Sequence, residues 1–77
     1  MTWVLYHAGQ GWLARGSVLS VCQLAEETRV TVALGDAHRF PPDQLTNARD
    51  MAAKLNAREG HPYWRAVRWD AACEIAK

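Results

Sequence analysis

Apolar and polar residues alternate along several short stretches of the chain, and this alternation predicts β-strands. The clearest example is RVTVAL, in which Val30, Val32 and Leu34 point to one side. Such a run is typical of a half-buried antiparallel strand. Other runs are rich in aromatic and β-branched residues, which favour strands for packing reasons. The predicted strands are residues 2–8 (TWVLYHA), 12–15 (WLAR), 29–34 (RVTVAL) and 63–69 (YWRAVRW).

Two further segments fit more than one structure. Residues 18–24 (VLSVCQL) suit either a strand or one turn of helix, and we favour a strand. The tail, residues 70–77 (DAACEIAK), suits either a short helix capped by Asp70 or an extension of the preceding strand. Gly9 and Gly11 predict a tight turn between the first two strands, because glycine tolerates positive φ.

Residues 42–59 follow a helical period, with apolar positions recurring every three or four residues. Pro42 suits the first turn of this helix, because its φ is fixed and it has no N–H to leave unpaired. Pro41 disfavours an earlier start, because it restricts the residue before it to extended conformations. Gly60 is expected to cap the C-terminal end, and Pro62 prevents continuation. The apolar stripe consists of Leu45, Ala48, Met51 or Ala52, and Leu55.

These elements predict an α+β fold, with a small antiparallel sheet of about four strands and one amphipathic helix (about residues 42–59) packed on one face. A single helix covers one face of a sheet, so the other face is expected to stay open. Trp3 and Tyr6 point to opposite sides of the first strand, and Trp64 and Trp69 to opposite sides of the last. The open face is therefore expected to carry at least one tryptophan or tyrosine.

Composition favours one folded domain over residues 1–77, because 49% of the residues are hydrophobic. The net charge of +1 argues against an acidic mimic of nucleic acid and against a strongly basic nucleic-acid binder. No signal peptide or membrane-spanning apolar run is visible. Cys22 and Cys73 are too few for the framework of a secreted disulfide protein. We expect a cytoplasmic protein with reduced thiols, although a single disulfide between these two cysteines stays open.

No pattern of reactive side chains predicts a catalytic or metal site. His7, His38 and His61 fall in different elements, without neighbouring ligands at metal-binding spacing. The carboxylates are scattered, and nothing marks either cysteine as an activated nucleophile. The expectation is a protein that is not an enzyme and that binds no cofactor and no metal.

Aromatic content is the informative feature, with four tryptophans and two tyrosines in 77 residues. Most of these rings are expected to fill the core between the sheet and the helix. In the run YWRAVRW, however, rings stand beside arginines, a combination typical of hot spots in protein interfaces. The predicted partner-binding residues are Tyr63, Trp64, Arg65 and Arg68, with Arg39 and Arg58 adding to the same patch.

Other interpretations of this run stay open. Arginine beside an aromatic ring can also stack on bases and hold phosphates, so direct nucleic-acid binding is a less favoured alternative. Arginines also protect the free edge of a sheet from aggregation, which would be a purely structural role. Because an unpaired edge could join a second copy, we expect a monomer or a weak homodimer.

A set of motif positions spans the chain: Trp3 and Leu5, Gly11-Trp12-Leu13, Ala37 and Phe40, and Ala48 and Ala52. In these positions the chain resembles a class of short bacteriophage and prophage proteins. The resemblance covers residues 3–16 and 37–69, whereas residues 17–34 depart from it. It implies a first strand, a hairpin strand, an alanine-rich helix and a closing strand with Trp or Val.

Within that class the chain is similar to anti-CRISPR proteins that inhibit type I systems. The resemblance implies a non-enzymatic inhibitor that binds a type I surveillance complex, such as a Cascade-like assembly. It would block target DNA binding or nuclease recruitment by steric hindrance. No site residue can be carried over, because this group shares no site motif. The alternative function is a small nucleic-acid-binding or regulatory accessory module.

Overall fold

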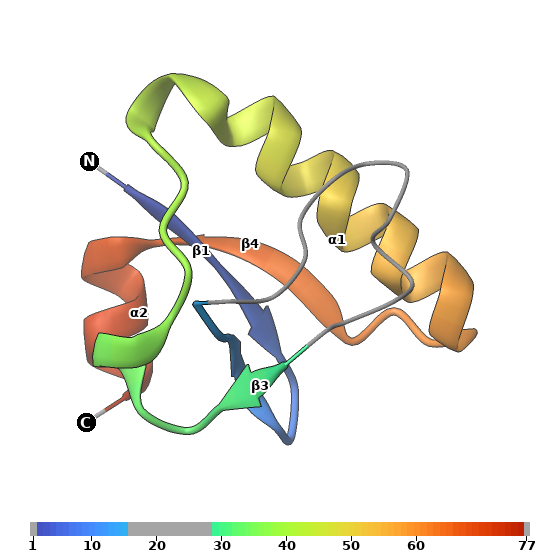
Figure 1. Ribbon diagram of the computed structural model, residues 1–77, viewed down its shortest axis with the longest axis horizontal. Helices are drawn as coiled ribbons and strands as arrows, with labels where there is room; N and C mark the ends of the chain where they lie inside the picture. Colours follow the sequence, from blue (N-terminus) through green and yellow to red (C-terminus); the bar gives the residue numbers. More distant parts are fainter. Residues whose placement is uncertain (1, 16–28, 77) are drawn as a thin grey trace.

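An antiparallel sheet forms the centre of the computed structural model, which describes residues 2–15 and 29–76 (Figure 1). Its strand order is β3-β2-β1-β4, so β1 is central and β4 forms one edge within the described part of the chain. The expected α+β class, with about four strands and a long helix against the sheet, is confirmed. The strands are β1 (Trp3–His7), β2 (Gly11–Leu13), β3 (Val30–Thr31) and β4 (Trp64–Arg68).

The longest strand pair joins the two ends of the chain. β1 and β4 run antiparallel from the pair Trp3–Arg68 to the pair His7–Trp64. Successive side chains therefore alternate between the two sides of the sheet. Trp64 packs on the side of the long helix α1 (Leu45–Glu59), and Trp69 packs on the other side of the sheet. The two rings therefore lie on opposite sides as expected, but Trp69 lies beyond the end of β4 and not within the strand.

Glycine is required in the turn between β1 and β2. Gly9 and Gly11 have φ values of 108° and 112°, a region that side-chain-bearing residues avoid. Gly11 also lies against the end of β3, because a Cβ atom on Gly11 would overlap the main-chain oxygen of Thr31. The predicted hairpin turn is therefore confirmed, and Gly11 additionally allows β3 to approach β2.

The predicted helix over residues 42–59 is confirmed. It begins as a 3-10 turn (Pro42–Gln44) and continues as α1 (Leu45–Glu59). Gly60 ends it in the left-handed region with φ of 75°, and its N–H donates to the Asn56 carbonyl at 2.8 Å. The buried residues of α1 belong to the predicted stripe; they are Ala48, Met51, Ala52 and Leu55.

The first hydrophobic core lies between α1 and the sheet. Leu5 from β1 and Leu13 from β2 are fully buried against Leu55 of α1. Phe40, which precedes the helix, closes the same cluster because its N–H and C=O pair with the main chain of Trp3. Burying an aliphatic side chain of this size contributes about 1.5–3 kcal/mol, so this cluster supplies much of the stability.

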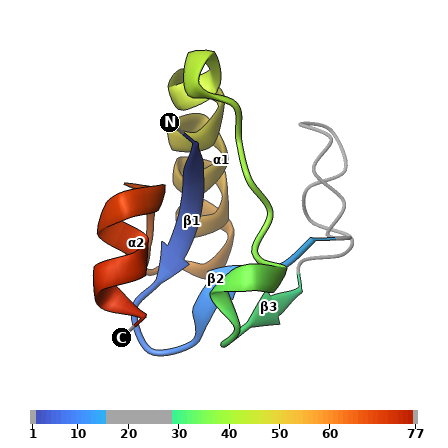
Figure 2. The ribbon, with the colours of Figure 1, turned by 90° about the vertical axis from the view of Figure 1, so that its left-hand side faces the viewer.

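A second core lies on the opposite face of the sheet, and the expectation of an open face is therefore wrong. The chain turns after β4 into α2 (Trp69–Ile75), and Figure 2 shows α2 and α1 on different sides of β1. Ala72 of α2 is fully buried against the sheet. The cluster consists of Val4, Trp12, Ala37, Val67 and Ala72, with Tyr6, Leu34 and Trp69 packed at its margin.

The strand predicted over residues 29–34 is much shorter than expected. Only Val30–Thr31 pairs with β2, because β2 itself has three residues. The Thr31 hydroxyl then accepts the N–H of Ala33 at 3.1 Å, which turns the chain into a 3-10 helix (Leu34–Asp36). Val32 is consequently 87% exposed, although its alternation suggested a buried side.

Three smaller expectations have different outcomes. The tail forms a helix rather than a strand extension, but Arg68, not Asp70, occupies its N-cap position. The predicted strand 12–15 ends at Leu13, with Ala14 in an isolated bridge. The strand favoured for residues 18–24 lies outside the described residues. Across the described ranges, no helix combines the length and apolar character needed to cross a membrane.

Candidate functional site

The predicted partner-binding residues divide into one core residue and a set of surface residues. Trp64 is only 3% exposed, whereas Tyr63 beside it is 45% exposed. This contrast follows from the alternation of β4, which turns Trp64 toward α1. The remaining predicted residues are exposed; they are Arg39, Arg58, Arg65 and Arg68.

Trp64 is held in the core by polar contacts as well as by packing. Its indole N–H donates to Glu59 Oε2 at 3.0 Å, and its main chain pairs with the Asn56 side chain. A ring fixed in this way presents almost no surface to a partner. Trp64 therefore belongs to the scaffold that supports its neighbours on β4, and the surface is built without it.

Arg65 and Tyr6 form the first exposed arginine–aromatic pair. They are cross-strand partners on β4 and β1, and the Arg65 guanidinium lies 5.5 Å from the centre of the Tyr6 ring. Tyr6 in turn packs against Trp12 of β2, with ring centres 4.8 Å apart. The cross-strand register thus fixes the ring on which Arg65 rests.

Arg39 and Trp69 form the second pair. The Arg39 guanidinium lies 3.9 Å from the centre of the Trp69 ring, close enough for a strong cation–π contact. Arg39 belongs to the segment between the 3-10 helix (Leu34–Asp36) and the 3-10 turn (Pro42–Gln44), and this segment is fixed beside β1 by the two hydrogen bonds between Phe40 and Trp3. Trp69 begins α2 and is fixed by its N–H, which donates to the Thr2 carbonyl at 2.9 Å.

The two pairs lie on the same side of the sheet, which we call the arginine–aromatic face, defined by Tyr6, Arg39, Arg65 and Trp69. Tyr6 and Trp69 both pack at the margin of the second core. Arg65 and Trp69 are four residues apart, a spacing of roughly 13 Å along an extended chain. The two positive charges therefore flank the part of the sheet that α2 covers.

Arg68 is engaged in an ion pair within the chain. Its Nη2 and Nε atoms donate to the two oxygens of Asp70 at 2.7 Å and 3.2 Å. The hydrogen bond from Arg68 is the main cause that lowers the pKa of Asp70, and the same bond raises the pKa of Arg68. Arg58 lies in the last turn of α1, where a positive charge suits the helix dipole. Neither residue joins the arginine–aromatic face.

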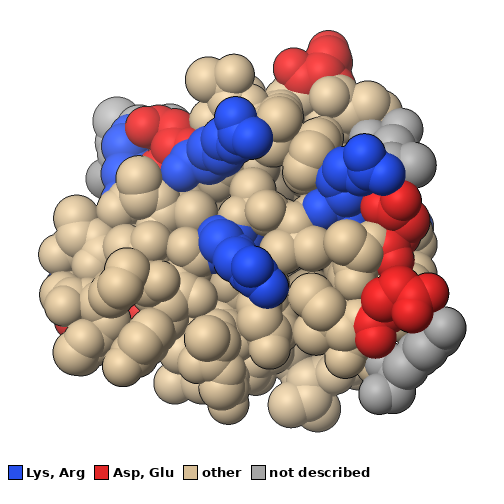
Figure 3. Space-filling view, turned by 180° about the vertical axis from the view of Figure 1, so that it is seen from behind, with Lys and Arg blue, Asp and Glu red and all other residues tan. Residues whose placement is uncertain are grey.

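Charge is sparse on the face of the molecule that Figure 3 shows. Seen from behind, Lys and Arg side chains stand separately across a largely uncharged face, with Asp and Glu mostly toward its margins (Figure 3). Such a surface combines isolated positive charges with apolar and neutral contact area. This arrangement suits protein recognition better than the continuous basic stripe of a typical nucleic-acid binder.

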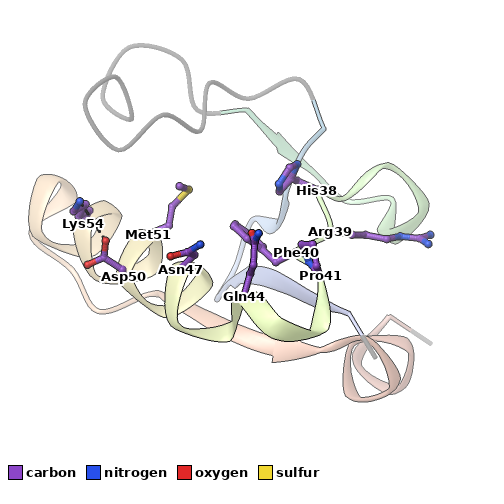
Figure 4. Close-up of a pocket in the computed structure, with 9 residues that line it drawn as sticks. All are labelled: His38, Arg39, Phe40, Pro41, Gln44, Asn47, Asp50, Met51 and Lys54. Carbon is purple, nitrogen blue, oxygen red and sulfur yellow. Dashed lines mark ion pairs between the residues drawn. The ribbon is translucent and has the colours of Figure 1, made fainter.

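A hollow of about 380 Å³ lies between α1 and the segment that precedes it. Figure 4 shows Asn47, Asp50 and Lys54 along α1, Gln44 in the 3-10 turn before it, and the His38 ring on the preceding segment. Asp50 and Lys54 form an ion pair of 3.2 Å, and burial lowers the pKa of His38. The hollow thus offers amides and an apolar wall, but it brings no nucleophile next to a base.

His7 is the one buried side chain with an unpaired nitrogen in the described part of the chain. It is 6% exposed, its Nδ1 has no hydrogen-bond partner, and its Nε2 lies 3.9 Å from Glu59 Oε2. The rings of Tyr63 and Trp64 contact it edge-on. Enclosure of this kind favours a packing role over access to a substrate.

The reactive side chains that the sequence offered do not converge in the described residues. His, Cys, Asp and Glu form no group of three suited to a metal ion there. Cys73 is exposed and free on α2, and Cys22 lies outside the described residues. The geometry therefore directs attention to binding surfaces.

Sequence reasoning identified Arg39 and Arg65 but missed Tyr6 as a site residue. The alternation of β1 did place Tyr6 opposite Trp3, yet the neighbour of Arg65 depends on the strand register. Trp69 was recognised as part of the last strand, whereas it begins α2 and meets Arg39 across a long sequence separation. Neither pairing leaves a local signal in the sequence.

Comparison with known proteins gives no relative for this chain. No protein-family description, curated protein or solved structure matched it.

Proposed function

We propose that this protein is a non-enzymatic binding protein whose arginine–aromatic face contacts a partner protein. The observation that carries the proposal is the pair of cation–π contacts, Arg39 on Trp69 and Arg65 on Tyr6, in which exposed arginines rest on half-buried rings. Neither arginine forms an ion pair within the described residues, so both charges are available to acidic groups of a partner. Because the rings already hold the guanidinium groups in place, binding loses less side-chain freedom.

The resemblance to small phage proteins gives this proposal its specific form. The partner is a type I CRISPR effector complex, and the protein inhibits it by occupying a surface needed for target DNA binding or nuclease recruitment. An inhibitor of this kind needs affinity and size, without chemistry. Two arginines anchored on aromatic rings are the kind of residues that dominate the energy of protein interfaces.

The test is affinity capture combined with a phage-plating assay. The tagged protein is expressed in cells that carry a type I effector complex and a matching spacer. We expect the effector subunits to be retained on the tagged protein, and plating efficiency of the targeted phage to rise. If no effector subunit is retained and interference is unchanged, the proposed target is wrong.

Direct nucleic-acid binding is the second candidate, favoured by the same arginine–ring pairs because they could stack on bases. The net charge of +1 weighs against it. A titration of labelled DNA at increasing salt separates the two candidates. A steep loss of micromolar binding with salt would support the nucleic-acid function, whereas the protein-binding function predicts no measurable DNA affinity at physiological salt.

A further inference from the structure

We propose that the outer edge of β4 binds an extended, acidic segment of a partner protein by strand addition. This inference rests on the proposed function only in taking the partner to be a protein. It concerns the groove between β4 and α1, which shares Arg65 with the arginine–aromatic face but no other residue of it. The proposal depends on the unpaired main chain of β4, the shape of the adjoining groove and its charge.

The main-chain groups of Ala66 and Arg68 point outward from the sheet. Two hydrogen bonds show which main-chain groups at β4 point inward to β1. Ala8 N–H donates to the Tyr63 carbonyl, and Trp69 N–H donates to the Thr2 carbonyl. In an antiparallel pair, main-chain groups alternate between the two edges of a strand. The outward groups therefore belong to every second residue, and Ala66 and Arg68 have no strand beside them in the described part of the chain.

The third outward residue, Trp64, demonstrates what this edge binds. Asn56 of α1 places its side-chain amide against Trp64, with Nδ2 donating to the carbonyl at 2.9 Å and Oδ1 accepting the N–H at 2.8 Å. This amide reproduces the contacts that a peptide group of a neighbouring strand would make. An incoming strand would continue the same pattern at Ala66 and Arg68, beginning where Asn56 ends.

Space for such a strand exists beside the edge. A hollow of about 310 Å³ lies between α1 and β4, and it includes the small side chains Ala52 and Ala53 on α1 and Ala66 on β4. Alanines allow a peptide backbone to approach closely, whereas larger residues would fill the groove. The hollow therefore reaches the free edge at Ala66 and is bounded at one end by Asn56.

The charge around the groove selects the occupant. Arg49 and Arg65 line it, although the Arg65 guanidinium rests on Tyr6 toward the other side of the sheet, and no acidic residue of the described ranges lines it. Arg68 lies on the same strand, although Asp70 engages its guanidinium. An acidic segment would be attracted, whereas a second copy paired through β4 would bring the arginines of both copies together. We therefore expect a Glu- or Asp-containing strand as the occupant, and not a second copy of this chain.

The experiment uses three synthetic peptides as probes: alternating Glu and Val, alternating Lys and Val, and the Glu–Val peptide with N-methylated main-chain nitrogens. Amide exchange of the full-length protein is followed by NMR. The Glu–Val peptide is expected to slow exchange at Ala66 and Arg68 by about tenfold or more at saturation. Equal protection by the Lys–Val peptide or the N-methylated peptide would overturn the proposal, as would the absence of protection with all three.

A matched pair of variants adds a second measurement. Ala53 and Ala57 are both exposed on α1, but only Ala53 lines the groove. Ala53→Glu is expected to weaken binding of the Glu–Val peptide by about tenfold, because it places a like charge in the groove. Ala57→Glu makes the same chemical change elsewhere and should alter affinity by less than about twofold. Equal effects of the two variants would contradict binding in this groove.

Self-association is distinguished in the same experiment. Protection of Ala66 and Arg68 that grows with protein concentration in the absence of peptide would assign the edge to a second copy and overturn the acidic occupant. The outcome is also independent of the effector target. Capture of an effector complex without protection by the Glu–Val peptide would retain the proposed function and reject strand addition, whereas protection by the peptide without capture would do the reverse.

Discussion

The side-chain amide of Asn56 binds both main-chain groups of Trp64, at 2.8 Å and 2.9 Å, and so joins α1 to the edge strand β4. Both groups lie in a partly buried position, where an unpaired amide is costly. The contact also fixes the end of β4 at which the buried Trp64 ring enters the first core. One asparagine thus connects helix, strand and core.

Asn56→Ala is expected to lower the free energy of unfolding by about 1–3 kcal/mol, because two hydrogen bonds are lost and their partners stay partly buried. Urea denaturation followed by tryptophan fluorescence measures the change. Asn47→Ala, an exposed position on the same helix, serves as the control and should change stability by less than about 0.5 kcal/mol. Equal losses for both variants would show that the contact with Trp64 contributes nothing.

Trp64→Ala should destabilise the fold by about 3–5 kcal/mol, since it removes a buried ring and leaves a cavity in the first core. Tyr63→Ala, at the neighbouring exposed position, is expected to cost about 0.5 kcal/mol. Thermal unfolding by circular dichroism compares the two variants. A fully folded Trp64→Ala protein with native stability would contradict the placement of this ring in the core.

Alanine variants of the two glycines in the first turn test how closely β3 approaches Gly11. Gly9→Ala meets only the strain of positive φ, because nothing lies near its added Cβ, and should cost about 1 kcal/mol. Gly11→Ala meets the same strain and also overlaps the Thr31 main chain, so a loss of about 3 kcal/mol is expected. Chemical denaturation measures both variants, and equal losses would mean that β3 does not approach Gly11 closely.

His38 predicts a dependence of stability on pH. Burial lowers its pKa below the ordinary value of 6.5, because the charged ring loses hydration. Below pH 6.5 the unfolded chain therefore binds more protons at His38 than the folded chain does. The free energy of unfolding is highest above pH 6.5 and decreases as the pH falls toward and through the folded pKa of His38. Proton NMR titration of the His38 ring should give a midpoint below 6.5, and His38→Gln should weaken this dependence. A midpoint above 6.5 would contradict the burial of this ring.

Local patterns predicted the parts of the fold that are locally determined. The 3–4 spacing and the Pro42 and Gly60 signals identified the long helix, and the content of aromatic and β-branched residues identified β1 and β4. Alternation overestimated β3, because the length of a strand depends on its partner and β2 ends at Leu13. A pattern within one strand contains no information about the strand beside it.

The site was less predictable than the fold for a related reason. α2 is short, and its single fully buried residue, Ala72, gives no helical stripe in the sequence that would reveal a second layer. The hypothesis of an open face was therefore wrong. Two arginines of the predicted set nevertheless rest on rings at the margin of the second core, Arg39 on Trp69 and Arg65 on Tyr6. The pairing of Arg39 with Trp69 depends on a contact between segments 30 residues apart, which only the folded chain creates.

Binding of a purified type I surveillance complex, immobilised for surface plasmon resonance, tests directly whether the arginine–aromatic face recognises a partner. The double variant Arg39→Ala/Arg65→Ala should bind at least about tenfold more weakly than the unmodified protein, with unfolding unchanged within about 1 kcal/mol. The double variant Arg15→Ala/Lys54→Ala serves as the control. It also removes two positive charges, but these form ion pairs outside the arginine–aromatic face, so this variant should bind within about twofold. Equal binding by all three proteins, or no binding by the unmodified protein, would contradict the proposed role of this face.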